Sequence, residues 1–272
     1  MQSDTSSDYQ TLRSMNVDAV RQSIRTGTYK RHTAGLAPGK LQANLAILPE
    51  KYALDFMRFC QRNPKPCPLV GVSETGDPMM RTLGKDIDIR TDVPGYNIYR
   101  DGVLEKSTHD ITDLWSDDLV VFALGCSFTF ERALIQAGIP LWHIDNDKTV
   151  PMYRTTLATR KAGVFGGGTV VSMRGIPTNR VKEATEISRR YPWAHGAPLH
   201  SGMPADIGIT DLGKPDWGDE APIKPDQTQM FWACGVTPQN AIREAKIPFS
   251  ITHTPGKMLI TDVDEFAEIP IL

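Results

Sequence analysis

The sequence predicts an α/β protein whose mixed sheet is divided between two subdomains. Three observations favour this class: helical stripes and strand-like alternation both occur, one strand–turn–helix unit is repeated, and 272 residues suffice for one large domain or two unequal ones. We expect residues 1–79 and 161–272 to form a larger α/β subdomain. Residues 80–160 are expected to form a smaller, inserted α+β subdomain.

Three segments have the spacing of amphipathic helices. Their apolar residues lie three or four positions apart on one helical face: Val17, Val20 and Ile24; Ala53, Met57 and Cys60; Val181, Ala184 and Ile187. Asn16, Pro49 and Thr178 stand where these helices begin. Gly27 follows the end of the first helix, and Asn63–Pro64 ends the second.

Strand signals lie between these helices. Residues 86–93 (DIDIRTDV) alternate charged residues with Ile, Thr and Val, which predicts a half-buried strand. Asp101–Gly102 separates YNIYR from VLEK, which predicts a two-residue hairpin turn. Residues 119–140 begin with the apolar run LVVFA and predict a buried strand, a turn and a helix.

The chain also contains an internal similarity. When the sequence is shifted by 108 residues, positions 121–140 align with positions 229–248, and six of the twenty residues are identical, Cys126 with Cys234 among them. Each copy predicts an apolar strand, a Cys beside a Gly, a helix, and an Ile-Pro before a strand that ends at His143 or His253. Two interpretations stay open: a duplicated βαβ unit whose Cys-bearing turns face one cleft, or an ordinary similarity between two strand–turn–helix units.

Composition excludes several classes of protein. The 30 basic and 32 acidic residues are not segregated, so nucleic acid is not the expected partner. No apolar run approaches the length of a membrane helix, and the polar N-terminus lacks a signal-peptide pattern, so we expect a cytoplasmic protein that does not bind membranes. Four cysteines without a CxxC pair predict reduced thiols and no zinc site. Whether the chain forms a homo-oligomer is left open.

Cys126 and Cys234 are the first candidate site residues, because each follows an apolar strand and precedes a helix. The start of a helix stabilises anions and lowers the pKa of a nearby thiol. Ser127, Gly235 and Thr237 share these two turns and are expected to help bind an anion there. Cys126 is expected to act as a hydrogen-bond donor rather than a nucleophile, and the alternative for both cysteines is a small buried residue beneath the turn.

Histidines and arginines supply the other candidates. His195 and His200 lie in the loop HGAPLH, where either is a candidate acid or base but the pair does not have the spacing of a helical zinc site. Carboxylate clamps are expected from Arg90, from Arg174 at the end of TVVSMR, and from Arg154 beside Tyr153 in PMYRT. Gly166–Gly168 precedes its strand without a GKS or GKT, so no nucleotide cofactor is expected.

Nine stretches, in order from about residue 30 to the C-terminus, resemble the bacterial hydro-lyase family that is similar to D-glutamate cyclase. They are HTAGLAPGKLQANLAILP, FCQRNPKPCPLVGV, DIDIRTDVPGYNIYRDG, GCSFTFERALIQAGIP, VPMYRT, VVSMR, HGAPLH, FWACGVTPQ and ITHTPGKMLITD. The resemblance implies an α/β protein of two subdomains and, from its cyclase member, loss of water from D-glutamate to give 5-oxo-D-proline. One departure is GGG after Phe165, where the family is expected to carry Gly-Pro.

Together these patterns predict an enzyme that removes water from a small acidic metabolite without a metal or redox cofactor. Cyclisation of glutamate is the most concrete version, with Arg154 and Arg174 holding carboxylates and His195 or His200 moving protons. One alternative is a dehydratase of another hydroxy or amino diacid. Another is a non-catalytic protein that binds acidic metabolites with the same arginines.

Overall fold

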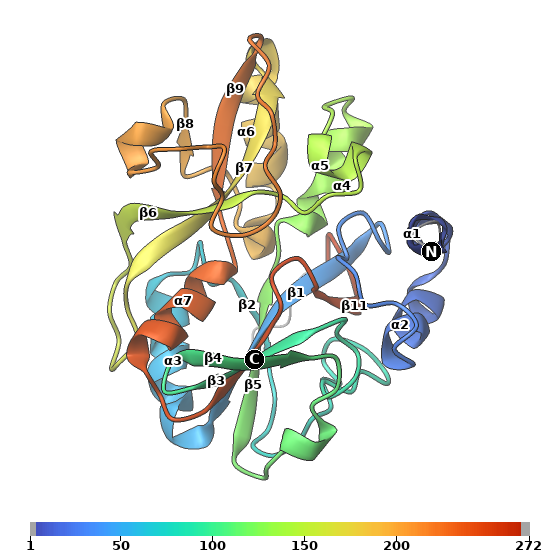
Figure 1. Cartoon of the computed structure of the whole chain (residues 1–272), viewed down its shortest axis with the longest axis vertical. Helices are drawn as coiled ribbons and strands as arrows, with labels where there is room; N and C mark the ends of the chain where they lie inside the picture. The colour runs from blue at the N-terminus through green and yellow to red at the C-terminus, as the bar shows by residue number, and fades with distance from the viewer. Residues whose placement is uncertain (1–3, 268–272) are drawn as a thin grey trace.

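The computed structural model describes residues 4–267, which form two antiparallel sheets with helices packed around them (Figure 1). The first sheet contains β1 (Lys40–Pro49), β2 (Leu69–Val72), β3 (Tyr96–Arg100), β4 (Val103–Thr108), β5 (Leu119–Gly125), β10 (Ser250–His253) and β11 (Leu259–Asp264). The second contains β6 (Met152–Ala158), β7 (Gly168–Pro177), β8 (His200–Ser201) and β9 (Gln227–Ala233). The helices are α1 (Asp4–Arg13), α2 (Val17–Arg25), α3 (Glu50–Arg62), α4 (Phe128–Gln136), α5 (Trp142–Asp145), α6 (Val181–Arg189) and α7 (Val236–Ala245).

The strand order is β2-β5-β1-β10-β3-β4 in the first sheet, with β11 also paired to β1, and β6-β7-β9-β8 in the second. The predicted α/β class with two parts is therefore confirmed, although the pairings between the described strands are all antiparallel rather than those of a mixed sheet. The sheets do not change at residues 80 and 160, because β3, β4 and β5 all pair within the first sheet. These pairings join segments far apart in the sequence, which local patterns do not reveal. The predicted domain boundaries themselves stay a prediction.

The predicted helices are present, with local differences. Asn16 accepts a hydrogen bond from the Ala19 N–H at 2.9 Å and caps α2, and Gly27 follows that helix with φ +70°. On α3 the buried face is Phe56, Phe59 and Cys60, whereas Met57 is exposed. Residues 178–180 form a 3₁₀ turn before α6, so Thr178 does not cap that helix as predicted.

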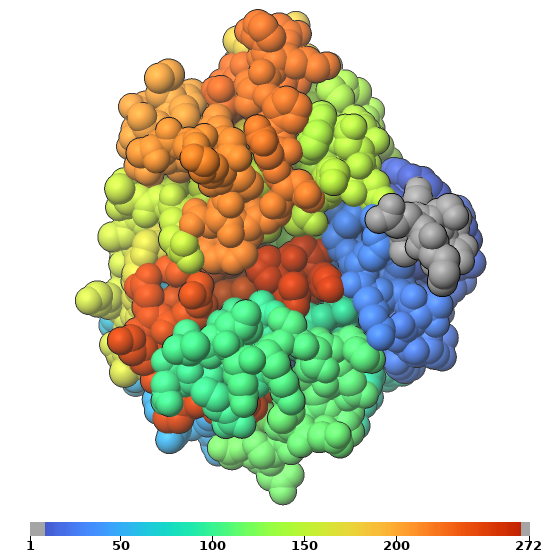
Figure 2. Space-filling model, in the orientation of Figure 1, coloured from blue at the N-terminus to red at the C-terminus, as the bar shows by residue number. Residues whose placement is uncertain are grey.

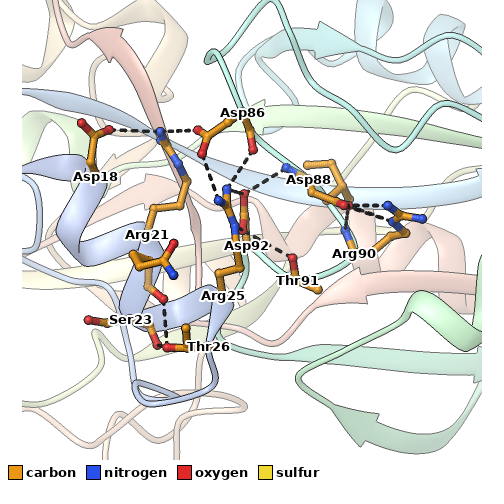
Figure 3. Close-up of polar contacts among 12 residues, drawn as sticks. Asp18, Arg21, Ser23, Arg25, Thr26, Asp86, Asp88, Arg90, Thr91 and Asp92 are labelled. Carbon is orange, nitrogen blue, oxygen red and sulfur yellow. Dashed lines mark hydrogen bonds and ion pairs between the residues drawn. The ribbon is translucent and has the colours of Figure 1, made fainter.

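The segment of residues 86–93 corrects the sequence prediction, because it is not a strand. Its acidic side chains instead hold α2: Arg21 and Arg25 both bind Asp86, and Arg25 also binds the buried Asp92 (Figure 3). The alternation of charges therefore reflects ion pairs rather than a sheet face. The predicted hairpin is confirmed, since Asp101 and Gly102 connect β3 to β4 with φ values of +49° and +78°.

The strands and the helix starts of the repeated unit correspond in both copies, and α7 ends one residue later than α4. β5 and α4 span residues 119–125 and 128–136, and β9 and α7 span 227–233 and 236–245, so each strand and each helix start is offset by the predicted 108 residues. The hydrogen bonds correspond as well. In the first copy the N–H of Cys126 donates to the Gln42 carbonyl, and the N–H of Gln42 donates to Thr129 Oγ1. In the second copy the N–H of Cys234 donates to the Val170 carbonyl, and the N–H of Val170 donates to Thr237 Oγ1.

The βαβ part of the repeat prediction is wrong. After α4 the chain forms the short helix α5, which contains His143, instead of a strand. After α7 it does form β10, which ends at His253, but β9 and β10 belong to different sheets. The physical reason is that residues 126–127 carry the chain from the first sheet to the second, and residues 234–235 carry it back.

The two crossings place the repeated helices on opposite parts of the molecule. Apolar residues of α4 pack with α6 and the second sheet, whereas those of α7 pack with α3 and the first sheet. Figure 2 shows the orange segments of the second part resting on the green and red segments of the first, with the blue N-terminal segments beside them. Within residues 4–267 no helix has the length and apolar character that would let it cross a bilayer.

Candidate active site

The two Cys-bearing turns lie together between the sheets, in a buried cluster rather than facing a cleft as one of the two interpretations predicts. Cys126 and Cys234 belong to one buried apolar cluster, and their thiols are close enough to interact electrostatically. Glycine is required beside both. A Cβ on Gly125 would lie 1.6 Å from the Trp193 carbonyl oxygen, and one on Gly235 would lie 2.1 Å from the Asn44 amide. The two turns are thus packed so closely that neither position has room for a side chain.

The expectation of low thiol pKa values is wrong. Burial raises the pKa of Cys126 well above its ordinary value and that of Cys234 to about 11. The N–H groups of Phe128 and Val236 do reach the two sulfurs and oppose this shift, but desolvation is the larger effect. Both thiols are therefore protonated near neutral pH and resemble the buried alternative rather than a nucleophile. Cys60 and Cys67 are buried as predicted, and burial raises the pKa of Cys67.

Arg174 is the centre of a buried polar network beside these turns. Its Nε lies 3.1 Å from Glu131 Oε1, its Nη2 donates to Ser127 Oγ at 3.0 Å, and its Nη1 donates to Ser172 Oγ at 3.0 Å. Rings of Phe130 and Trp232 flank the guanidinium at 5.3 Å. Arg174 lies within β7, which continues to Pro177, and not at the end of the strand as the sequence predicts. Every guanidinium nitrogen has a protein partner.

Glu131 connects this network to a cavity. Its Oε1 accepts from Arg174 and lies 2.8 Å from His143 Nε2, while its Oε2 is buried without a hydrogen-bond partner among residues 4–267. Burial alone would raise the pKa of Glu131, but the charges of His143 and Arg174 lower it below the ordinary value. The carboxyl group is therefore ionised at neutral pH, with one oxygen fully engaged and the other not.

The cavity has a volume of about 270 Å³ and lies between α4 and the loop of residues 35–40; we call it the α4 pocket. Its lining includes Glu131, the first turn of α4, and the basic residues Arg13, Lys40 and Arg132. Gln42 holds the loop in place, because its Nε2 donates to the Thr33 and Leu36 carbonyls at 3.0 and 3.1 Å. The pocket thus combines an ionised carboxylate with three cationic side chains.

A second acidic residue, Glu265, also lines the α4 pocket. Its Oε1 lies 3.3 Å from Arg132 Nη1, and its side chain is 3% exposed. Burial raises the pKa of Glu265, in contrast with Glu131. Two carboxyl groups with opposite pKa shifts in one cavity are characteristic of a site that performs acid–base chemistry.

Four of the predicted site residues lie away from this pocket. Arg90 pairs with Asp88 beside α2, and the half-exposed Arg154 pairs with Asp216. The Tyr153 hydroxyl donates to the Leu212 carbonyl at 2.7 Å, and burial raises its pKa to about 12. His200 lies on β8 with Nε2 2.8 Å from the Met203 carbonyl oxygen. The structure does not bring these four together with Arg174.

His195 lies closer to the network. It is buried, with Nδ1 2.8 Å from the Lys65 carbonyl oxygen and Nε2 without a partner among the described residues. Desolvation lowers its pKa to about 4, and the nearby charge of Arg174 contributes. Its imidazole is therefore neutral near pH 7. Gly235 directly precedes α7, and Thr237 lies in its first turn. The Thr237 hydroxyl accepts from the Val170 N–H and lies within hydrogen-bond distance of the Val170 carbonyl oxygen.

Glu131, His143, Arg132 and Lys40 were not among the site residues predicted from the sequence. Glu131 sits in an ordinary position for an acidic residue, the first turn of a helix, so the pattern indicates a surface role. Its burial follows from Arg174, which reaches it from β7. No group of three or more His, Cys, Asp or Glu residues within residues 4–267 is arranged to hold a metal ion.

Comparison with known proteins shows the family of the chain. The model of the D-glutamate cyclase family matches residues 120–262. Proteins named "Putative hydro-lyase" from Dinoroseobacter shibae and Ruegeria pomeroyi are 67% and 63% identical over 264 residues, which cover 97% of this chain and 88% and 96% of theirs. One from Jannaschia sp. is 62% identical over 253 residues, 93% of this chain and 95% of its own.

A solved structure, the nitrogen repressor-like protein of Methanococcus jannaschii, covers 87% of this chain and 91% of its own with a TM-score of 0.40 and 11% identity, a likeness too low to bear on function. The sequence relatives and the family model do identify a carbon–oxygen lyase. The chain belongs to the D-glutamate cyclase family.

Proposed function

We propose that the protein closes D-glutamate into 5-oxo-D-proline in the α4 pocket, with loss of one water molecule. Membership of the D-glutamate cyclase family supports the reaction class. The observation that carries the proposal for this pocket is Glu131, an ionised residue with one unpartnered carboxylate oxygen among residues 4–267, which lines a cavity that also contains three cationic side chains. A zwitterionic amino diacid has the complementary charges: two carboxylates and one ammonium group.

The cationic residues are assigned to the carboxylates of the substrate. Arg132 and Lys40 come from opposite sides of the pocket, α4 and the start of β1, and Arg13 comes from α1. A carboxylate held by a guanidinium loses part of its negative charge, which makes its carbon easier for an amine to attack. The positive end of α4 favours the same charge. The cavity of about 270 Å³ leaves room for a molecule of ten non-hydrogen atoms.

Glu131 is assigned to the protons. Cyclisation forms a C–N bond between the amine and the side-chain carboxyl carbon, breaks one C–O bond, and moves two protons from nitrogen to the departing oxygen. An ionised carboxylate can accept each proton from nitrogen and return it to that oxygen, so one residue suffices for both transfers. The lowered pKa of Glu131 keeps it ionised before reaction and makes it a good donor once protonated.

His143 and Arg174 are assigned to positioning rather than to contact with substrate. Both bind the same oxygen of Glu131 and so leave the other free of protein partners among residues 4–267. The enzyme then has only to hold a short chain in a folded conformation, because the attacking amine and the carboxyl carbon belong to one molecule. In this proposal the buried cysteines shape the turn before α4 and form no covalent intermediate.

Incubation of the purified protein with D-glutamate and, separately, with L-glutamate tests the proposal. Chiral chromatography resolves the two 5-oxoproline enantiomers, and we expect product from the D isomer at a rate proportional to protein concentration. An absorbance rise near 240 nm, about where conjugated alkenoates absorb, would instead indicate a dehydratase. No product from either isomer at high protein concentration would refute the glutamate proposal.

A further inference from the structure

Glu265, in the short segment of residues 264–267, forms part of the wall of the α4 pocket. On its other side lies a second cavity of about 170 Å³, bounded by the turn of residues 190–194. Glu265 and Thr129 line both cavities. Glu265 therefore stands between the α4 pocket and a neighbouring space large enough to receive a displaced side chain.

Glu265 is held in this place by few contacts. Its N–H donates to the Gly39 carbonyl at 2.9 Å, and its carboxylate pairs with Arg132 at 3.3 Å. The next residue, Phe266, is 66% exposed and touches the ring of Tyr191 at 5.1 Å between centroids. β11 ends at Asp264, which pairs with Lys40, so displacement of the Glu265 side chain leaves the strand pairing intact.

The chemistry of this contact resembles that expected of substrate. Arg132 extends into the pocket and already binds a carboxylate, and that carboxylate is 3% exposed with its Oε2 lacking a partner within residues 4–267. A buried half-satisfied carboxyl group is costly, and burial raises its pKa. An incoming carboxylate would replace it on the same guanidinium.

We propose that Glu265 is an internal competitor, whose carboxylate occupies the place of a substrate carboxylate on Arg132 and must be displaced before an acidic substrate binds. The inference rests on the proposed function, because it takes Arg132 as a substrate clamp. It adds a specificity filter: only a ligand with a carboxylate can exchange for Glu265, whereas an uncharged analogue leaves the segment in place.

Binding of glutarate tests the inference separately from turnover. Glutarate has the two carboxylates of glutamate but no amine, so it cannot cyclise. Isothermal titration calorimetry compares the wild type with Glu265→Gln and Glu265→Asp; the shorter Asp keeps the charge but retracts it from Arg132. Glu105→Gln is a matched control, because Glu105 pairs with Arg100 at the same 3.3 Å on an exposed hairpin.

We expect both Glu265 variants to bind glutarate more tightly than the wild type, by roughly two- to fivefold, the range for a partly exposed ion pair. Glu105→Gln should bind like the wild type. Circular dichroism at the assay temperature confirms that each variant is folded. Glutaramide, the uncharged diamide, should bind none of them.

Unchanged or weaker glutarate binding by folded Glu265 variants would overturn the inference, even if the wild type converts D-glutamate. Such a result would show that the 264–267 segment contributes to the structure but does not compete with the ligand. If no variant binds glutarate and the wild type forms no 5-oxoproline, the inference and the proposed function both fail. If glutarate binds as expected but no 5-oxoproline forms, the competitor stands and the cyclase proposal alone is refuted.

Discussion

Glu131 and Arg174 form a buried ion pair between a helix of one repeat and a strand of the second sheet. Their side chains are 2% and 1% exposed, and the same Glu131 oxygen also faces His143. Such a pair costs desolvation free energy and contributes to stability only when both partners remain. Its evident consequence is orientation, because it fixes one oxygen of a residue that lines the α4 pocket and leaves the second oxygen without a partner among residues 4–267.

Glu131→Gln is predicted to abolish most turnover. The amide keeps the size of the side chain but cannot accept a proton from the substrate nitrogen, so the rate should fall by about 10²–10⁴. Initial rates of 5-oxoproline formation measure this. Glu186→Gln on the exposed face of α6 is the control and should be unaffected. A Glu131→Gln rate within twofold of the wild type would remove Glu131 from the chemistry.

Arg174→Met is predicted to destabilise the protein by about 3–5 kcal/mol, because it leaves Glu131 as an unpaired buried charge. Urea unfolding followed by circular dichroism gives the free energy of unfolding. Adding Glu131→Gln to Arg174→Met should recover part of the loss, since the uncompensated charge is gone. Strictly additive losses in the double variant would show that the two residues are not coupled.

Cys126→Ser and Cys234→Ser are predicted to retain appreciable turnover, because neither thiol is ionised at neutral pH. Iodoacetamide at pH 8 should alkylate the native protein far more slowly than the urea-unfolded chain, with mass spectrometry as the readout. A loss of several orders of magnitude in Cys126→Ser, at unchanged stability, would instead indicate a nucleophilic thiol.

Stability is predicted to decrease as the pH falls from about 6.5 toward 4. Burial lowers the pKa values of His195 and His253 to about 4, so between these limits the unfolded chain binds protons that the folded protein does not. The free energy of unfolding is therefore highest above about pH 6.5 for these groups and falls below it. His253→Gln should show a shallower pH slope in urea unfolding. An identical slope would contradict the assignment.

Gly235→Ala is predicted to be strongly destabilising, although φ is −66° and the backbone suits any residue. The cause is the Asn44 amide, only 2.1 Å from the new Cβ. Asn44 donates to the Leu124 and Gly125 carbonyls and cannot move without losing both bonds. Thermal unfolding measures the effect, and Gly138→Ala, where no atom lies within 4 Å of the Cβ, separates crowding from backbone strain. Equal effects at both sites would contradict crowding.

Local structure was predictable from the sequence where residues close together in the chain determine it. The Asn16 cap, the Asp101–Gly102 turn and the offset of 108 residues are all visible in the sequence and present in the structure. Residues 86–93 misled because charge alternation suits either a strand or a set of ion pairs, and the arginines that decide between them lie on α2.

The candidate site was less predictable, because its determinants come from distant segments. Nothing near Glu131 indicates that Arg174 will reach it from β7, some forty residues along the chain. Likewise, the cysteine pattern indicates helix starts correctly, but the sign of the thiol pKa shift depends on burial between two sheets. Lys40 and Arg132 line one pocket because α4 packs against β1.

A crystal structure of Glu131→Gln with D-glutamate bound tests the assignment of the α4 pocket most directly, since this variant should hold the substrate without converting it. We predict electron density in the α4 pocket, with a carboxylate on Arg132, the amino group beside residue 131, and Glu265 displaced. Ordered D-glutamate at any other place, for example in the open surface hollow beside Arg21 and Lys85, with the α4 pocket unchanged, would contradict it.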